Sequence, residues 1–282
     1  MHEVGAASSA SRLTRAPNHP WQRMILIAMV AIAVTVSTLE PWWARLIPSA
    51  SDSLATLPSV MLWAWERPER LDFIDPKAVG VAFLAQTLHL SGPDVVIRPR
   101  LQPLRVPPGT ALMAVVRIDV DRLHPPALSP QQRESAAAAI ADRRELPEIA
   151  ALQIDFDAAV SQRSFYRDLL HDVRRHLPSD LPLSMTALAS WCTHDGWLEG
   201  LPVDEVVPMV FRMGADQDRV RRYLDEDDFG VAFCRQSLGV STDEPLPTRR
   251  PLRRLYLFHP QPWSPGAFTR ILEEVGQWPQ YP

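Results

Sequence analysis

The chain has 282 residues, of which 46% are hydrophobic and 22% are charged, and its formal net charge is −4. This is the composition of an ordinary globular protein, and it excludes a largely disordered chain. The net charge provides no basic field to neutralise phosphates, so we expect no nucleic-acid partner.

An uncharged apolar segment lies near the N-terminus. Residues 24–39 read MILIAMVAIAVTVSTL, with Arg23 and two earlier arginines before them and Trp42 and Trp43 after them. With the tryptophans as interfacial anchors, this segment approaches the ~20 residues that a bilayer requires. Because arginines precede it, we expect the N-terminus to stay in the cytoplasm. The sequence therefore predicts a transmembrane anchor, or uncleaved signal, at residues 24–43.

Two other interpretations fit this segment less well. A cleaved signal peptide needs a small-residue cleavage site, and the best one, from Ser53 to Ala55, lies well beyond the apolar residues. A buried core helix would show polar residues on one face, which this segment lacks. The expected order is a cytoplasmic tail at 1–23, the anchor, a linker at 44–58 and a folded domain at 59–282. This describes a single-pass protein of a bacterial inner membrane, with its folded domain in the periplasm or outside the cell.

Apolar segments recur along the folded domain and predict eight β-strands. They are residues 60–65, 79–86, 111–118, 151–156, 181–188, 205–211, 229–234 and 254–259. Apolar residues at helical spacing predict four helices between or after them. They are residues 130–141, 164–177, 217–224 and 264–275.

The alternation of strands and helices favours an α/β fold with a parallel sheet. Eight strands in this length predict a (β/α)₈ TIM-like barrel with some helices reduced or missing. Residues 91–109 are rich in proline and predict an extended excursion in place of a helix, and residues 236–251 also look irregular. An open doubly wound sheet is the alternative, but no glycine-rich phosphate turn follows the first strand.

The chain has two cysteines, Cys192 and Cys234, with no spacing typical of a zinc site. Both fall on or next to predicted strands that are not neighbours in the sheet. We therefore expect free buried thiols, with a disulfide as the alternative. We also expect no metal and no cofactor, since no H-x-H or H-E-x-x-H motif occurs.

The strand at 151–156 carries the clearest candidate site. Because side chains alternate along a strand, Gln153, Asp155 and Asp157 share one face. In parallel barrels, the carboxyl ends of the strands carry the reacting groups. Acids, arginines and tryptophans at the other predicted strand ends would meet there. They are Trp65, Glu66, Arg117, Asp119, Trp191, Arg212, Arg235 and His259.

These residue types point to a carbohydrate ligand. Glycosidic cleavage uses two carboxyl groups, and we expect Asp155, Asp157 and Glu66 to be the catalytic candidates. Tryptophan faces suit sugar rings, and arginine forks hold carboxylates. The remaining residues at the strand ends are then candidates for substrate binding. The structural alternative is that the acids cap helices or pair with arginine across the barrel.

The central third of the chain has a recognisable pattern. A strand ending I-D-x-D at residues 154–157 precedes a helix carrying Tyr166, followed by L-S-M-T-A-L-x-x-W at 183–191 and V-D-E at 203–205. This pattern resembles an uncharacterised bacterial domain-of-unknown-function family that is grouped by fold with TIM-barrel glycoside hydrolases. The resemblance implies a TIM-barrel fold and assigns no reaction.

One position departs from a related pattern. Chitinase-like barrels place a glutamate two positions beyond the last aspartate of their D-x-D strand, where this chain has Ala159. The acid of a hydrolytic site would then be Asp157 or a residue of another strand, Glu66 being the first choice.

Two functions remain for the protein. One is an exported, membrane-anchored barrel that binds an envelope carbohydrate and could hydrolyse it. The other is a non-catalytic module that binds a polysaccharide or protein.

Overall fold

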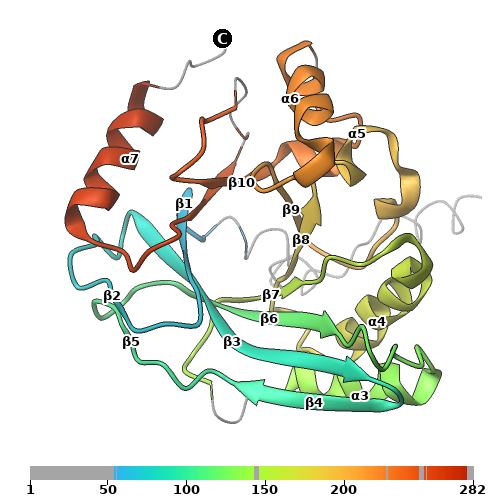
Figure 1. Ribbon diagram of the computed structural model, residues 1–282. Helices are drawn as coiled ribbons and strands as arrows, with labels where there is room; N and C mark the ends of the chain where they lie inside the picture. The colour runs from blue at the N-terminus through green and yellow to red at the C-terminus, as the bar shows by residue number, and fades with distance from the viewer. Residues whose placement is uncertain are drawn as a thin grey trace, which may run out of the picture. The chain divides into compact units, whose positions relative to one another are not determined.

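Eight parallel strands close into a barrel in the computed structural model, which describes residues 54, 56–142, 146–226, 228–247, 251 and 253–277 (Figure 1). Hydrogen-bonded neighbours follow the order β1-β11-β10-β9-β8-β7-β6-β3, and β3 pairs back with β1. The strands are β1 (Val60–Ala64), β3 (Val79–Ser91), β6 (Leu112–Val120), β7 (Ala151–Asp155), β8 (Leu183–Leu188), β9 (Glu205–Met209), β10 (Ser237–Ser241) and β11 (Arg254–Phe258). The predicted parallel barrel is confirmed.

Helices follow five of these strands. They are α3 (Pro130–Ala141), α4 (Arg163–His176), α5 (Trp191–His194), α6 (Gln217–Glu226) and α7 (Pro265–Gln277). The 3₁₀ turns are η2 (Val160–Gln162), η3 (Gly196–Leu198), η4 (Gly214–Asp216) and η5 (Ala232–Arg235). Figure 1 shows α3 and α4 side by side. All four predicted helices are present, with ends within a few residues of those expected.

Short strands replace two of the helices of a regular barrel. The connection from β1 to β3 contains β2 (Glu69–Arg70), and the connection from β3 to β6 contains β4 (Asp94–Pro99) and β5 (Leu104–Arg105). β4 runs antiparallel to β3 and widens the sheet outside the ring, while β2 pairs with β5. The extended excursion expected at 91–109 therefore corresponds to β4 and β5.

Local sequence explains the starts of helices α3 and α4. Ser129 caps α3 by accepting a hydrogen bond from the backbone N–H of Gln132 at 3.1 Å, and Pro130 occupies the first helical turn. α4 buries one face at helical spacing against β7, including Phe165, Leu169 and Val173. Both helices begin within one residue of the predicted start.

The seventh strand was predicted wrongly. Residues 229–234 form no strand, since η5 occupies their end, and β10 lies instead within the segment expected to be irregular. β10 reads Ser-Leu-Gly-Val-Ser, so its inward face is made of small residues that hide the usual apolar signal. Gly239 is required there because a Cβ atom would lie 2.6 Å from the Trp63 ring, which crosses the barrel at this level.

The prediction of free cysteines was also wrong, because Cys192 and Cys234 form a disulfide with Cα atoms 5.8 Å apart. Neither cysteine is on a strand: Cys192 lies in α5 and Cys234 in η5. The displaced seventh strand caused the error, since it placed Cys234 inside the sheet.

The barrel interior contains a chain of polar contacts centred on Glu205. The Glu205 carboxylate binds Arg254 Nη1 at 2.5 Å and accepts hydrogen bonds from Ser184, Ser237 and Tyr256 at 2.6–2.9 Å. All five residues are at most 3% exposed. A charge at this depth is stable only when it is paired and fully hydrogen-bonded. The four strands β8 to β11 therefore meet at one carboxylate.

The same chain of contacts reaches the remaining side of the barrel. Ser184 accepts a hydrogen bond from Gln153 at 3.0 Å, and Gln153 accepts one from Trp63 Nε1 at 2.9 Å. At the other end, Arg254 donates to the carbonyl oxygens of Leu54 and Pro58 at 2.5 and 3.0 Å. Leu54 is fully buried, so part of the predicted linker at 44–58 packs inside the barrel.

The predicted tail at 1–23 and anchor at 24–43 lie outside the described residues. Among the helices that the structure does describe, none has both the length and the apolar character needed to cross a bilayer.

Replacing Glu205 with alanine should strongly destabilise the barrel. Arg254 would remain buried without a counter-charge, and such losses cost about 3–5 kcal/mol. The free energy of unfolding from urea denaturation measures this, with Glu273→Ala on the exposed face of α7 as the control. The pair Glu205→Leu with Arg254→Met should recover much of the loss. A Glu205→Ala loss no larger than that of the control would contradict the role given to this carboxylate.

Candidate functional site

A pocket of about 280 Å³ opens at the carboxyl ends of the barrel strands. Its lining comes from six strands and the segments that follow them: β1, β6, β7, β8, β9 and β11. In the ring of eight, β7 stands opposite β11. Asp155 ends β7, Asp157 follows it two residues later, and Phe258 ends β11. Acids therefore lie on one side of the pocket and aromatic rings on the other.

Asp155 is the buried acid of the pocket, with 6% of its surface exposed. Thr186 Oγ1 donates a hydrogen bond to Asp155 Oδ1 at 2.7 Å, and Arg117 Nη1 lies 3.8 Å from Oδ2. Burial raises the pKa of Asp155 to about 6, and the charge of Asp157 adds to the rise, against the opposing effects of Thr186 and Arg117. Asp155 therefore titrates close to neutral pH.

Asp157 is the more exposed acid of the pair. Burial of its carboxyl group raises its pKa, with a further increase from Asp119 and a decrease from Arg117. Within the described residues, its carboxylate makes no hydrogen bond or ion pair at contact distance. Asp157 is therefore the carboxylate with capacity left for a ligand.

Four aromatic rings form the opposite wall, which we call the aromatic wall: Trp63, Trp65, Phe211 and Phe258. Phe211 and Phe258 stack with centroids 5.5 Å apart and planes 7° apart. Trp65 meets Phe258 edge-on at 6.4 Å, and Trp63 lies 6.1 Å from Phe211. Each ring is thus held by another, which favours a rigid apolar surface.

Two guanidinium groups lie over this wall. Arg117 is 5.8 Å from the Trp65 ring centre, and Arg212 is 5.1 Å from that of Phe258. Arg212 has a φ of 49°, a left-handed conformation that non-glycine residues rarely adopt. Glu244 accepts a hydrogen bond from the Arg212 backbone N–H at 2.9 Å, and Asp243 binds its guanidinium at 3.0 Å. These acids hold Arg212 in its strained position at the pocket.

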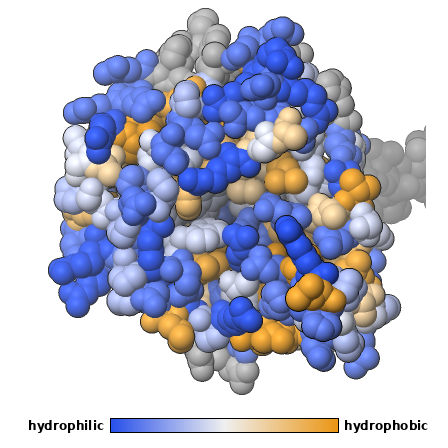
Figure 2. Space-filling model, viewed as in Figure 1, coloured by the Kyte–Doolittle hydropathy of each residue, from blue (hydrophilic) through white to orange (hydrophobic). Residues whose placement is uncertain are grey.

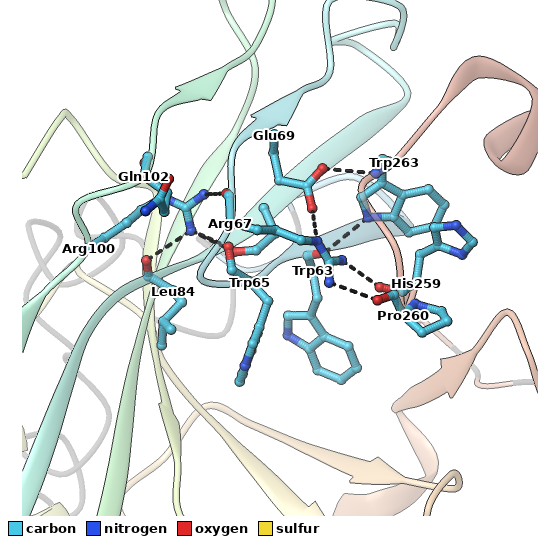
Figure 3. A network of polar contacts seen from close by, with 11 residues as sticks. Trp63, Trp65, Arg67, Glu69, Leu84, Arg100, Gln102, His259, Pro260 and Trp263 are labelled. Atoms are coloured by element: carbon cyan, nitrogen blue, oxygen red, sulfur yellow. Dashed lines mark hydrogen bonds and ion pairs between the residues drawn. The ribbon is translucent and has the colours of Figure 1, made fainter.

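Arg100 fixes the loop that carries Trp65 (Figure 3). It comes from the excursion between β3 and β6 and donates to the carbonyl oxygens of Trp65 at 2.5 Å and Arg67 at 2.6 Å. Its Nε donates to the carbonyl of Gln102 at 2.8 Å. The guanidinium therefore binds the backbone carbonyl groups of the loop that follows β1.

Arg67 and Glu69 tie the same loop to the segment after β11. Arg67 donates to the carbonyl oxygens of His259 and Pro260 at 2.5 and 3.2 Å and to the Glu69 carboxylate at 2.6 Å. Glu69 in turn accepts a hydrogen bond from the backbone N–H of Trp263 at 2.9 Å (Figure 3). The loop beside Trp65 is thus held by Arg100 on one side and by the segment after β11 on the other.

The structure brings together five of the ten residues proposed for the site. Asp155, Asp157, Trp65, Arg117 and Arg212 line the pocket. This grouping follows from the alternation of side chains and the shared orientation of parallel strands, as the sequence predicts.

The other five lie elsewhere. Glu66 is exposed beside the backbone N–H of Leu101, and Asp119 accepts a hydrogen bond from Arg117 at 2.9 Å in a neighbouring hollow. Trp191 is buried, with Arg163 over its ring. Arg235 donates to the Phe229 carbonyl, and His259 packs on Trp263 with a ring separation of 5.0 Å. Burial lowers the pKa of His259, and the nearby charge of Arg67 lowers it further.

Among the lining residues that sequence reasoning missed are Thr186, Phe211 and Phe258. Thr186 shares the inward face of β8 with Ser184, so alternation could have identified it. The phenylalanines carry no distinguishing signal, because apolar residues at strand ends usually belong to the core.

Across the described residues, no group of three or more His, Cys, Asp or Glu side chains is arranged to hold a metal ion.

Residues 108–218 match the model of a family described as a domain of unknown function, DUF3142. The match covers less than half of the chain and includes β6 to β9, which supply the acid side of the pocket. Searches of curated proteins and of solved structures found no significant match. The family description adds no activity to what the pocket itself indicates.

Asp155→Asn should stabilise the folded protein at neutral pH. Between about pH 4 and pH 6 the folded state holds the Asp155 proton more tightly than the unfolded chain does, so stability falls as pH rises across this window. A pKa raised from 3.8 to about 6 corresponds to about 3 kcal/mol, which is the upper limit of the gain expected from asparagine above that window.

Urea denaturation at neutral pH and near pH 4 measures this difference, which should shrink toward zero in acid. Asp180→Asn, an exposed change before β8, is the control and should show no gain. An asparagine variant that is less stable than the native protein at neutral pH would show that ionised Asp155 is well accommodated.

Proposed function

We propose that the barrel binds a carbohydrate of the bacterial envelope in its mouth and hydrolyses a glycosidic bond there. The observation that carries this proposal is one pocket with two carboxyl groups on one side and four aromatic rings on the other. Aromatic faces pack against the C–H surfaces of sugar rings, and paired carboxyl groups supply the acid and base of glycosidic cleavage.

The two aspartates take different roles in this proposal. Environments that separate the pKa values of a carboxyl pair assign the acid and the base. Asp155, buried and with a pKa of about 6, is the proton donor to the leaving oxygen. Asp157, more exposed, is the base that activates water or the nucleophile. The products gain the elements of water: hydroxide at the anomeric carbon and a proton on the leaving oxygen.

Asp155 replaces Glu66 as the second carboxyl group in this scheme. Glu66 does not line the pocket, and its carboxylate lies near the backbone N–H of Leu101. Thr186 and Arg117 position the Asp155 carboxyl group from two sides. The aromatic wall would hold the sugar ring facing the two acids.

The contacts of Arg117 favour a second candidate function, a non-catalytic carbohydrate-binding module. Its guanidinium hydrogen-bonds Asp119 and lies near Asp155, so part of the acid charge is already balanced. In such a module the aspartates would accept hydrogen bonds from sugar hydroxyls without transferring protons. Binding without turnover would separate this module from the enzyme.

The proposed location is the outer side of a bacterial inner membrane. The Cys192–Cys234 disulfide supports it, because structural disulfides persist mainly in oxidising compartments. The predicted anchor and the arginines before it would retain the N-terminus in the cytoplasm and export the barrel.

Asp157→Asn should abolish cleavage while leaving the fold intact. Loss of an acid–base group lowers turnover by about 10²–10⁴-fold. The release of reducing ends from purified envelope polysaccharides and short oligosaccharides measures it. Asp180→Asn, at the opposite end of the barrel, is the matched control. Native turnover in the Asp157→Asn protein would remove this residue from the chemistry.

The cysteines should be unreactive in protein isolated from a bacterial envelope. Alkylation under denaturing conditions should label neither Cys192 nor Cys234 until a reductant is added, as mass spectrometry would show.

A reporter fused after Pro282 should be active only on the outer side of the inner membrane. Reporter activity confined to the cytoplasm would reject the proposed location.

A further inference from the structure

A second hollow, of about 380 Å³, adjoins the pocket at Asp155 and Asp157. Arg117, Asp155 and Asp157 line both spaces. The rest of this second space, which we call the ledge, is lined by His89, Phe156 and residues 118–120 and 122. The acid pair therefore stands at the junction of two spaces of different character.

Unequal strand lengths create the ledge. The pairing of β6 with β7 ends at Arg117 and Asp155, while the pairing of β6 with β3 continues to Val120 and Leu90. These ends of β3 and β6 therefore project beyond β7 at the mouth. β4 pairs with the projecting part of β3 from the other side, so the ledge has a backing strand (Figure 1).

The ledge presents polar side chains that stay partly exposed, although Asp119 accepts a hydrogen bond from Arg117 and His89 Nε2 lies 4.0 Å from Asp121. The Asp119 side chain is 43% exposed, and that of His89 is 28% exposed. Arg122 is exposed and forms no ion pair with the described residues. Asp121 fastens the following turn by accepting hydrogen bonds from the backbone N–H groups of Leu123 and His124. A fixed polar surface thus continues the aromatic pocket past the acids.

The outer surface of the molecule is mainly polar in the view of Figure 2, with separate hydrophobic groups and no broad apolar patch. Two exposed apolar side chains, Leu123 and Val160, stand on the loops that leave β6 and β7. A polar chain with apolar ring faces matches such a rim better than a compact apolar molecule does.

We propose that the pocket and the ledge form one binding trough, and that the ligand is an oligosaccharide that crosses the acid pair. One sugar ring packs on the aromatic wall, and at least one more lies on the ledge, hydrogen-bonded to Asp119, His89 or Arg122. This inference rests on the proposed function and specifies its substrate: a chain of several sugars, bound across the bond to be cleaved. A monosaccharide would occupy only the aromatic half.

The length dependence of binding tests this inference. Full-length protein is titrated calorimetrically at 4 °C with β-1,4-linked N-acetylglucosamine, its de-N-acetylated form and β-1,4-linked glucose, each from monomer to hexamer. Recovered ligands are checked for cleavage. In at least one series, affinity should rise about tenfold or more from monomer to tetramer, because new contacts form on the ledge.

Two variants separate the halves of the trough. Arg122→Ala combined with His89→Ala should remove most of the gain with length, whereas Trp65→Ala should weaken binding at every length. Arg98→Ala, an exposed change on β4 outside both spaces, is the control.

Affinity that is independent of length, or a gain that survives loss of Arg122 and His89, would overturn the trough and leave the carbohydrate pocket standing. Binding in none of the three series would overturn both.

Discussion

The buried carboxylate of Glu205 is the constraint on which the barrel depends. It is paired with Arg254 and accepts hydrogen bonds from Ser184, Ser237 and Tyr256, all of them buried inside the barrel. An unpaired charge there would be prohibitive, so the positions of β8 to β11 must satisfy it together. Through Ser184 and Gln153 the same contacts reach Trp63, which stands at the base of the pocket. The polar core thus fixes both the strand positions and the floor of the site.

The site combines groups that would be unfavourable elsewhere in the fold. Asp155 is buried with its pKa raised, Arg212 has a left-handed backbone, and Asp157 has no partner at contact distance among the described residues. Strain and perturbed ionisation concentrate at functional sites because the surrounding structure must enforce them. Here the enforcement comes from Thr186, Glu244 and the stacked phenylalanines. Their arrangement at one end of the barrel marks this pocket as the candidate functional site.

Much of the architecture can be predicted from local sequence. The predictions that failed did so for physical reasons. The acid side of the pocket is predictable because alternation along β7 puts Gln153, Asp155 and Asp157 on one face. β10 is not predictable, because its inward residues are small, and Gly239 leaves room for the Trp63 side chain of β1. The disulfide was missed for the same reason, since the misplaced strand separated the cysteines. Phe211 and Phe258 of the aromatic wall were missed because phenylalanine at a strand end resembles ordinary core.

Arg100 links the least regular part of the barrel to its mouth. The excursion that replaces a helix between β3 and β6 delivers this guanidinium to the carbonyl groups around Trp65, and Arg67 secures the loop from the side of β11. Little of this rim remains to be ordered when a ligand arrives. The conformational entropy of this loop is therefore lost largely during folding, and this side of the mouth is preorganised.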